Sequence, residues 1–222
     1  MKRNQPIILL LCLLISVNAK SQFSKGDKLI GGAISSYSSN STYVYTNNPG
    51  SNNSFGSGFI PRYSWVTKNN RMNGVFLNAN YSHSKTTGSS TPNGYSISNY
   101  YSFGVGYFVR KYNDFNQQLG WFLEYNGVVS YLGNKQEQSL MGNISYYKSW
   151  EVAAGVNVSP GLYYRASRAV LVEAAFGGVN AKYSKGQGYG TQSEGFNIGL
   201  NFPSNFTFGL QFLVGRKQGS KS

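Results

Sequence analysis

The chain has 222 residues, and charged residues make up 12% of it, against about 25% in ordinary soluble domains. This low fraction disfavours a coiled coil, a typical cytosolic enzyme or a charged disordered tail, and a mean hydropathy of −0.34 excludes a bundle of transmembrane helices. Aromatic residues reach 16% and glycines number 27, a combination that favours many strands joined by polar turns. The length predicts one or two domains.

The first segment, 1–21, has the pattern of a secretory signal peptide. A short basic start precedes an apolar run at 7–17, and the small residues Ala19 and Ser21 precede the expected cleavage site after Ser21. A membrane-spanning helix is the weaker alternative, because it would need about 20 apolar residues.

Cleavage would remove Cys12, the single cysteine of the chain. Lipoprotein processing at Cys12 is not expected, because Leu11 stands where that processing requires a small residue. The exported chain, 22–222, is predicted to be one domain without a disulfide, stabilised by an extensive hydrogen-bonded structure. Three basic residues leave with the signal peptide, so the formal net charge falls from +13 to +10.

Eight segments of the exported chain alternate with a period of two, which is typical of β-strands. In chain order they are 28–37, 55–65, 74–82, 101–110, 121–131, 152–159, 170–177 and 206–215. In the last of them, Phe208, Leu210 and Phe212 alternate with Gly209 and Gln211. One face of each predicted strand is therefore large and apolar, and the other is small or polar.

The predicted connections alternate in length. Four are long and rich in Ser, Asn, Gly and Thr (38–54, 85–98, 133–148 and 184–194), and the others are short (67–71, 111–118 and 165–168). Long loops at one end and short turns at the other are typical of outer-membrane barrels, so we expect four extracellular loops.

Two barrel architectures compete for this pattern. A soluble lipocalin-like barrel buries its apolar face, whereas a membrane barrel turns that face outward. The opposite face carries glycines with Asn, Ser and a few charged residues, which suit a tight polar lumen filled by short side chains (Gly31, Gly56, Gly58, Gly104, Gly106, Gly155, Gly177 and Gly209). We therefore predict an all-β, eight-stranded antiparallel up-and-down transmembrane β-barrel. Aromatic residues near the strand ends are predicted to form its girdles (Trp65, Tyr131, Trp150, Tyr163 and Tyr164).

Five charged residues are predicted to face the lumen as a polar network: Arg62, Arg110, Glu124, Glu151 and Glu173. An unpaired buried charge is costly, so each needs a partner. The network could act as a gate or filter of a narrow porin-like channel or small-solute transporter, or as a structural plug. An eight-stranded interior is only just wide enough for side chains, which favours the plug.

No catalytic, cofactor or metal site is expected. His83, the single histidine, stands between Ser82 and Ser84 near a predicted strand end, and a Ser–His–acid lipid-modifying enzyme is the remote alternative. No carboxylate lies near it in sequence, and one histidine without cysteine leaves no zinc site. The glycine-rich stretch 186–190 lacks the lysine and helix of a phosphate-binding loop.

Basic residues gather at the predicted turns and the C-terminal tail: Lys68, Arg71, Arg110, Lys111, Arg165, Arg168, Arg216 and Lys217. Nucleic acid is not an expected partner, because the basic residues are otherwise dispersed along the chain. Contact with lipid phosphates of the inner leaflet is the favoured interpretation.

Four segments, 25–32, 103–110, 158–164 and 206–212, resemble the small outer-membrane β-barrel domain family of Gram-negative bacteria, related in shape to OmpA- and OmpX-type barrels. Together with the signal ending at Ser21, they resemble the Bacteroidota members. The chain departs from the usual aromatic C-terminus by continuing through 216–222.

This resemblance implies outer-membrane insertion and no shared enzymatic residues. The implied partners are outer-membrane lipids and lipopolysaccharide, and the barrel-assembly machinery during insertion. A non-enzymatic structural or surface-interaction role is therefore expected, with no specified extracellular ligand.

Overall fold

The computed structural model describes residues 24–45, 48–68, 70–88, 94–140, 142–167, 169–188 and 190–215. Within the strands, the side chains of 43–45, 48–49 and 201–206 are not described. The predicted signal peptide and the C-terminal tail therefore lie outside the described residues. The described residues contain no helix that is long and apolar enough to cross a membrane.

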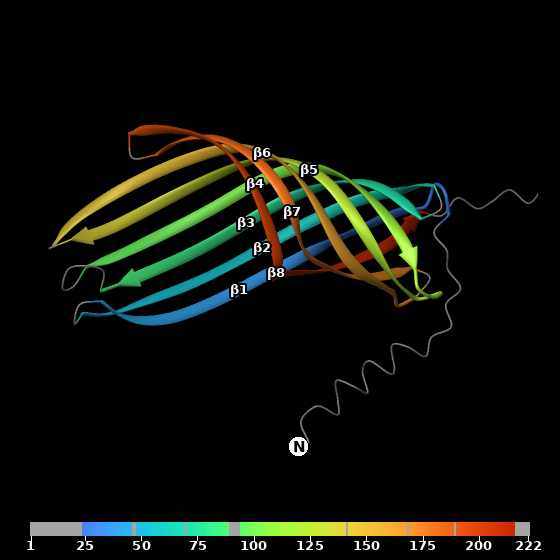
Figure 1. The fold of residues 1–222 in the computed structure, drawn as a ribbon, viewed down its shortest axis with the longest axis horizontal. Coiled ribbons are helices and arrows are strands. Elements are labelled where there is room, and N and C mark those ends of the chain that lie inside the picture. The colour runs from blue at the N-terminus through green and yellow to red at the C-terminus, as the bar shows by residue number, and fades with distance from the viewer. Residues whose placement is uncertain are drawn as a thin grey trace, which may run out of the picture.

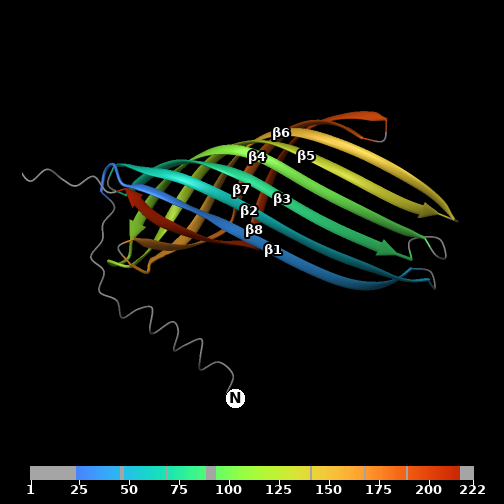
Figure 2. The same cartoon turned by 180° about the vertical axis from the view of Figure 1, so that it is seen from behind.

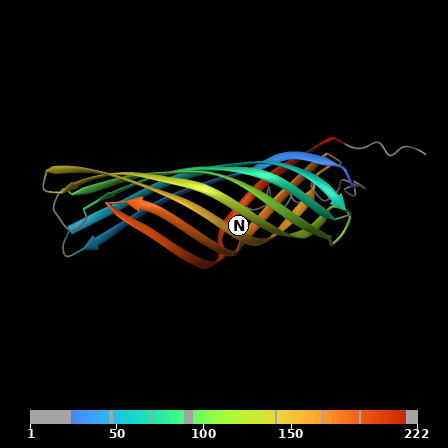
Figure 3. The same ribbon diagram turned by 90° about the horizontal axis from the view of Figure 1, so that it is seen from above.

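In the part of the chain that the structure describes, eight antiparallel strands form a closed barrel in chain order (Figure 1). They are β1 (Lys28–Tyr45), β2 (Asn48–Lys68), β3 (Arg71–Thr87), β4 (Tyr95–Asp114), β5 (Leu119–Leu140), β6 (Asn143–Arg165), β7 (Val170–Gly188) and β8 (Thr191–Gly215). The start of β1 and the end of β8 lie together at one end, called the termini end here (Figure 2). The opposite end is called the hairpin end, and the view in Figure 3 shows the strands running obliquely between the two. The prediction of an all-β antiparallel fold is confirmed.

Large apolar side chains cover the outside of the barrel. Successive residues of a strand point to opposite faces, and on β4 this sends Phe103, Val105 and Tyr107 outward, where Phe103 is 59% exposed. The same alternation recurs on the other strands, and we call these exposed residues the outer apolar band (Ile30, Ile34, Phe55, Phe59, Tyr63, Val75, Leu77, Tyr101, Phe103, Val105, Tyr107, Trp121, Tyr125, Val129, Tyr131, Val152, Val156, Phe208, Leu210 and Phe212). The assignment of the apolar face to the outside is therefore correct.

The prediction of four long loops is wrong. The strands continue through most of the polar segments, so that β1 joins β2 through residues 46–47, β5 joins β6 through 141–142, and β7 joins β8 through 189–190. Positive φ angles at Gly142 (83°) and Gly190 (78°) suit such tight hairpin turns. Among the four connections at this end of the barrel, the β3–β4 connection, 88–94, is the longest. The physical reason is that backbone ladders also form between strands that are polar on both faces.

The interior at the termini end is packed with aromatic rings, so the prediction of short side chains there is wrong. An aromatic cluster of Phe76, Phe108, Tyr112, Phe122 and Tyr163 is buried together with Leu29, Val66, Met72 and Leu171. The interior glycines make room for these rings. Four rings lie over the glycine directly opposite on the neighbouring strand: Phe108 over Gly74, Phe76 over Gly106, Phe122 over Gly161 and Tyr163 over Gly120.

Two irregularities shape the rest of the barrel. The first is the short ladder that closes it, which joins residues 28–34 of β1 to 208–215 of β8, although β1 continues to Tyr45. On β7, the pairing shifts at Gly177 and Gly178, which have positive φ angles of 40° and 151°. Such a bulge changes which alternate residues face inward, so Glu173 faces the interior before the bulge, and Asn180 and Lys182 line it afterwards.

Candidate functional site: an ion network and a cavity in the barrel interior

Arg110 of β4 lies at the centre of a buried ion network. Its Nε donates to Glu124 Oε2 of β5 at 3.0 Å, and its two terminal nitrogens form ion pairs with Glu124 and with Glu173 of β7. Arg110 Nη1 also donates to the Tyr112 hydroxyl at 3.0 Å, and that hydroxyl donates to Glu173 Oε1 at 2.9 Å. The guanidinium lies 4.2 Å from the centroid of the Phe122 ring, a cation–π distance.

Arg62 of β2 completes the charge balance of the network. Its Nη1 donates to Glu124 Oε2 at 2.7 Å, and its guanidinium lies 5.2 Å from the Phe108 ring centroid. Two arginines therefore face two carboxylates, with no net charge. The amides of Asn126 and Gln211 donate to Glu124 Oε1 (3.0 Å) and Glu173 Oε2 (2.8 Å), so both carboxylates have neutral partners as well.

A separate ion pair, outside this network, lies close to the termini end. Arg165 of β6 donates to Asp114 Oδ1 of β4 at 3.2 Å, and the Tyr163 hydroxyl donates to the same oxygen. Two predictions are corrected here: Tyr163 is 1% exposed and is not part of a girdle, and the buried Arg165 does not face lipid phosphates. Strand parity explains both, because Tyr163 and Arg165 share the inner face of β6 with Gly161.

The ion network and the aromatic cluster together fill the lumen near the termini end. Side chains from β2, β4, β5, β7 and β8 meet across it, and all four network charges have a partner of opposite sign. This arrangement ties together strands that are not neighbours in the sheet. The network supplies paired, desolvated charges in the barrel interior.

Glu151, the fifth residue of the predicted network, does not join the other four. Its Oε1 lies 2.5 Å from Lys182 Nζ, and the two side chains are 35% and 41% exposed. This pair lies toward the hairpin end of the interior. Farther out, Tyr95 donates to Glu137 Oε1 at 2.6 Å, and this hydrogen bond raises the pKa of Tyr95.

The remaining predicted girdle residues lie at the surface. Tyr131 and Trp150 are exposed, and Trp65 and Tyr164 are half-buried. The Trp65 ring contacts Tyr107 on β4, with ring centroids 6.4 Å apart.

The surroundings of His83 contain no serine–histidine–acid arrangement in the part of the chain that the structure describes. His83 Nδ1 lies 2.9 Å from Asn99 Oδ1, and the hydroxyl of Ser84 donates instead to Asn52 Oδ1 at 3.0 Å. No group of three or more His, Cys, Asp or Glu side chains able to hold a metal ion occurs among the described residues.

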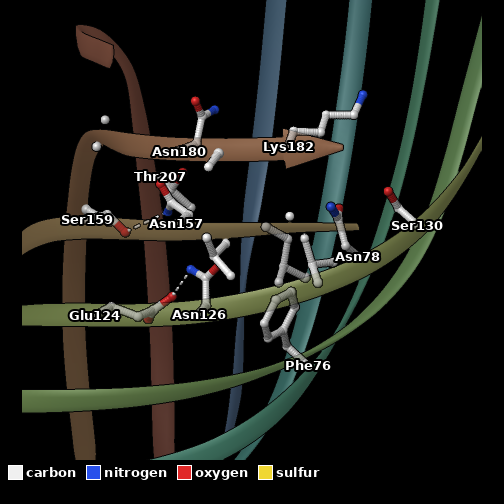
Figure 4. A pocket seen from close by; sticks show the side chains of 18 of the residues that line it. Phe76, Asn78, Glu124, Asn126, Ser130, Asn157, Ser159, Asn180, Lys182 and Thr207 are labelled. Atoms are coloured by element: carbon white, nitrogen blue, oxygen red, sulfur yellow. Dashed lines mark hydrogen bonds between the residues drawn. The ribbon is translucent and has the colours of Figure 1, made fainter. Parts of the chain in front are cut away.

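A cavity of about 370 Å³ lies in the interior on the hairpin side of the ion network (Figure 4). We call it the amide cavity, because Asn78, Asn126, Asn157 and Asn180 line it from β3, β5, β6 and β7. Phe76, Arg62 and Glu124 also line it, where it meets the aromatic cluster and the ion network.

Sequence reasoning missed several interior residues. Lys182 and Asn180 lie beyond the β7 bulge, so an alternation continued from Glu173 assigns them to the wrong face. The pair Gly177-Gly178 was the available signal, since glycines inside a strand often mark a bulge. Tyr112 lies beyond the predicted end of its strand, and only the extended β4 carries it into the interior.

No protein-family model matches the chain, and no curated protein matches it in sequence. Among solved structures, the chain is similar to Neisserial surface protein A, with 13% identity, a TM-score of 0.35, and coverage of 86% of this chain and 98% of that chain. The fold is therefore defined by the strand ladders of this chain alone, which form an all-β antiparallel barrel.

Proposed function

We propose that this chain is an outer-membrane β-barrel protein of the OmpA/OmpX type, of the Bacteroidota kind, with a non-enzymatic structural or surface-interaction role. The observation that supports this most directly is the distribution of side chains: the outer apolar band faces outward, while the charges of the ion network lie inside, where Arg110, Glu124 and Glu173 are buried and the Arg62 side chain is 14% exposed. Such an outer surface is unfavourable in water and favourable in hydrocarbon. Backbone pairing also closes the sheet, through the ladder between residues 28–34 of β1 and 208–215 of β8, and a spanning sheet requires such closure.

In this proposal the termini end faces the periplasm after removal of segment 1–21. Lys68, Arg71 and Lys111 are exposed near that end, where they would contact lipid phosphates. The hairpin end, including the polar parts of β5 and β6, would face the exterior next to lipopolysaccharide. Insertion would require the barrel-assembly machinery.

The proposed location predicts that the full chain, expressed in a Gram-negative host, is recovered in the outer-membrane fraction. The closed barrel should resist unfolding by detergent at room temperature, so its gel mobility should change on boiling. A periplasmic protein fused to the same signal segment is the matched control for the fractionation. Recovery as a soluble periplasmic monomer would contradict the proposal.

The filled lumen predicts that the purified protein produces no single-channel current in a planar bilayer. The ion network closes the interior with paired side chains from five strands, which does not favour the channel or transporter alternative based on Arg62, Glu124 and Glu173. A wide porin reconstituted in parallel provides the positive control. Reproducible current steps that change in size in Arg62→Gln would instead support the channel.

A non-enzymatic role is proposed because His83 is hydrogen-bonded to an amide and the neighbouring Ser84 hydroxyl is engaged on β2. The remote alternative of an outer-leaflet lipid-modifying enzyme requires a base and a nucleophile in contact. Unchanged lipid A in a deletion strain would agree with the proposal, and altered lipid A restored by the wild-type gene but not by His83→Ala would oppose it.

A further inference from the structure

The amide cavity is closed on one side and lined by groups of mixed hydrogen-bonding character. Toward the termini end it stops at Phe76, Arg62 and Glu124, beyond which the aromatic cluster fills the interior. A solute would therefore reach it from the hairpin end, along the side on which Lys182 lies (Figure 4). Such a blind cavity can hold a molecule but gives it no passage through the barrel.

The amides of the cavity wall retain hydrogen-bonding capacity. Within the described part of the chain, Asn78 uses its Oδ1 to accept from Asn80 at 2.6 Å, while Asn126 and Asn157 use their Nδ2 atoms to donate to Glu124 and Ser159. The remaining ends of these three amides are available to a molecule in the cavity: Asn78 Nδ2 as a donor, and Asn126 Oδ1 and Asn157 Oδ1 as acceptors.

The charges that line the cavity favour a neutral occupant. Arg62 is paired with Glu124, and Lys182 is paired with Glu151, so each cation already has its counter-charge. An ionic ligand would have to disrupt one of these pairs. A purely apolar ligand would offer no partner to the unused ends of the amides or to the hydroxyls of Ser130 and Thr207, which carries a desolvation cost.

The size of the cavity fits a small molecule. A volume of 370 Å³ corresponds to about twelve water molecules at ~30 Å³ each, and lies near the lower limit of ligand pockets in proteins. We propose that the amide cavity binds a neutral, hydroxyl-rich solute of the size of a mono- or disaccharide. Its hydroxyls would donate to and accept from the amides, and its C–H face would pack on the Phe76 ring.

Nuclear magnetic resonance of the purified barrel tests this inference. The full chain, labelled with ¹⁵N in its asparagine side chains, is studied in a detergent without a sugar headgroup and titrated with glucose, trehalose and myo-inositol. At least one of these probes should shift the Asn side-chain signals saturably, with a Kd in the range of about 1–10 mM, typical of a few hydrogen bonds.

The variants identify the site of binding. Asn157→Leu keeps the approximate volume but removes the amide, and should weaken binding about tenfold, equivalent to ~1.4 kcal/mol. Asn78→Leu provides a second cavity variant if Asn157→Leu does not fold. The matched control is Asn53→Leu on the exposed part of β2, which should leave the Kd unchanged.

Two results would overturn the inference: the absence of saturable shifts for all three neutral probes, or tighter binding of the charged analogues gluconate or glucosamine. The inference goes beyond the proposed function. Its failure would leave the membrane location untouched, because binding is measured on purified protein and location is measured by fractionation.

Discussion

Replacing Glu124 by alanine is expected to lower the free energy of unfolding by about 3–5 kcal/mol, the usual cost of removing one partner from a buried ion pair. The variant leaves Arg62 and Arg110 close together in the interior, with Glu173 as their remaining carboxylate. It also removes the acceptor of the Asn126 amide. Urea titration of the protein in detergent micelles, followed by tryptophan fluorescence, measures the difference.

Two further variants separate the buried charge from general side-chain loss. Glu124→Gln keeps the shape of the side chain and one acceptor oxygen, so its free energy of unfolding should lie between those of the wild type and Glu124→Ala. Glu151→Ala removes a carboxylate from a pair that is one-third exposed, and should cost no more than ~1 kcal/mol. Equal losses of unfolding free energy in Glu124→Ala and Glu151→Ala would mean that the buried ion network stabilises the barrel no more than the exposed pair does.

The second large effect is expected at the glycines beneath the aromatic cluster. A methyl group on Gly106 would meet the Phe76 ring and would lie only 2.6 Å from the carbonyl oxygen of Gly127. Gly106→Ala should therefore destabilise the barrel by about 1–3 kcal/mol through overpacking. Phe76→Ala alone should cost about 3–5 kcal/mol, because it opens a space in the aromatic cluster.

A double-mutant cycle tests whether the ring and the glycine act as a pair. If Phe76 lies over Gly106, the combined variant should be less destabilised than the sum of the single variants, by about 0.5–3 kcal/mol. Gly127→Ala is the control, since its nearest atom would be 3.9 Å away, and it should be neutral or slightly stabilising. Strict additivity of Gly106→Ala and Phe76→Ala would show that the two do not interact.

Sequence reasoning reached the architecture because the outer face obeys a simple rule. Phe103, Val105 and Tyr107 alternate with Gly104 and Gly106, and similar alternation recurs on the other strands, interrupted on β7 by its bulge. The large apolar side chains on one face of each predicted strand were enough to assign that face to the outside, although the inner face also carries buried aromatic rings.

The strand ends could not be predicted in the same way. The segment 39–41 of β1 pairs with residues 52–54 of β2, although both partners are polar on both faces. Hydrophobic alternation fades once a strand leaves the apolar surroundings, while the backbone hydrogen bonds continue. A composition rich in Ser and Asn therefore predicts loops where the structure has extended hairpins.

Strand parity assigns charged residues to the interior but does not reveal how the interior packs. Arg62, Glu124 and Glu173 follow from parity, and an unpaired charge inside a narrow tube requires a partner. The pairing of Phe108 with Gly74, or of Phe122 with Gly161, depends on the register between strands. Register is set by turns and bulges far from those residues, so a pattern within one strand cannot reveal it.

The ladder between β1 and β8 has a consequence for how the chain folds. All other ladders join strands that follow one another in sequence, so each can form as a local hairpin with a small loop-closure entropy. The closing ladder instead joins the two ends of the described chain, from Lys28 with Gly215 to Ile34 with Phe208. Contacts of such high sequence separation form slowly. Until this ladder closes, the nascent sheet exposes two unpaired edges together with its apolar face, and it is then most prone to aggregate.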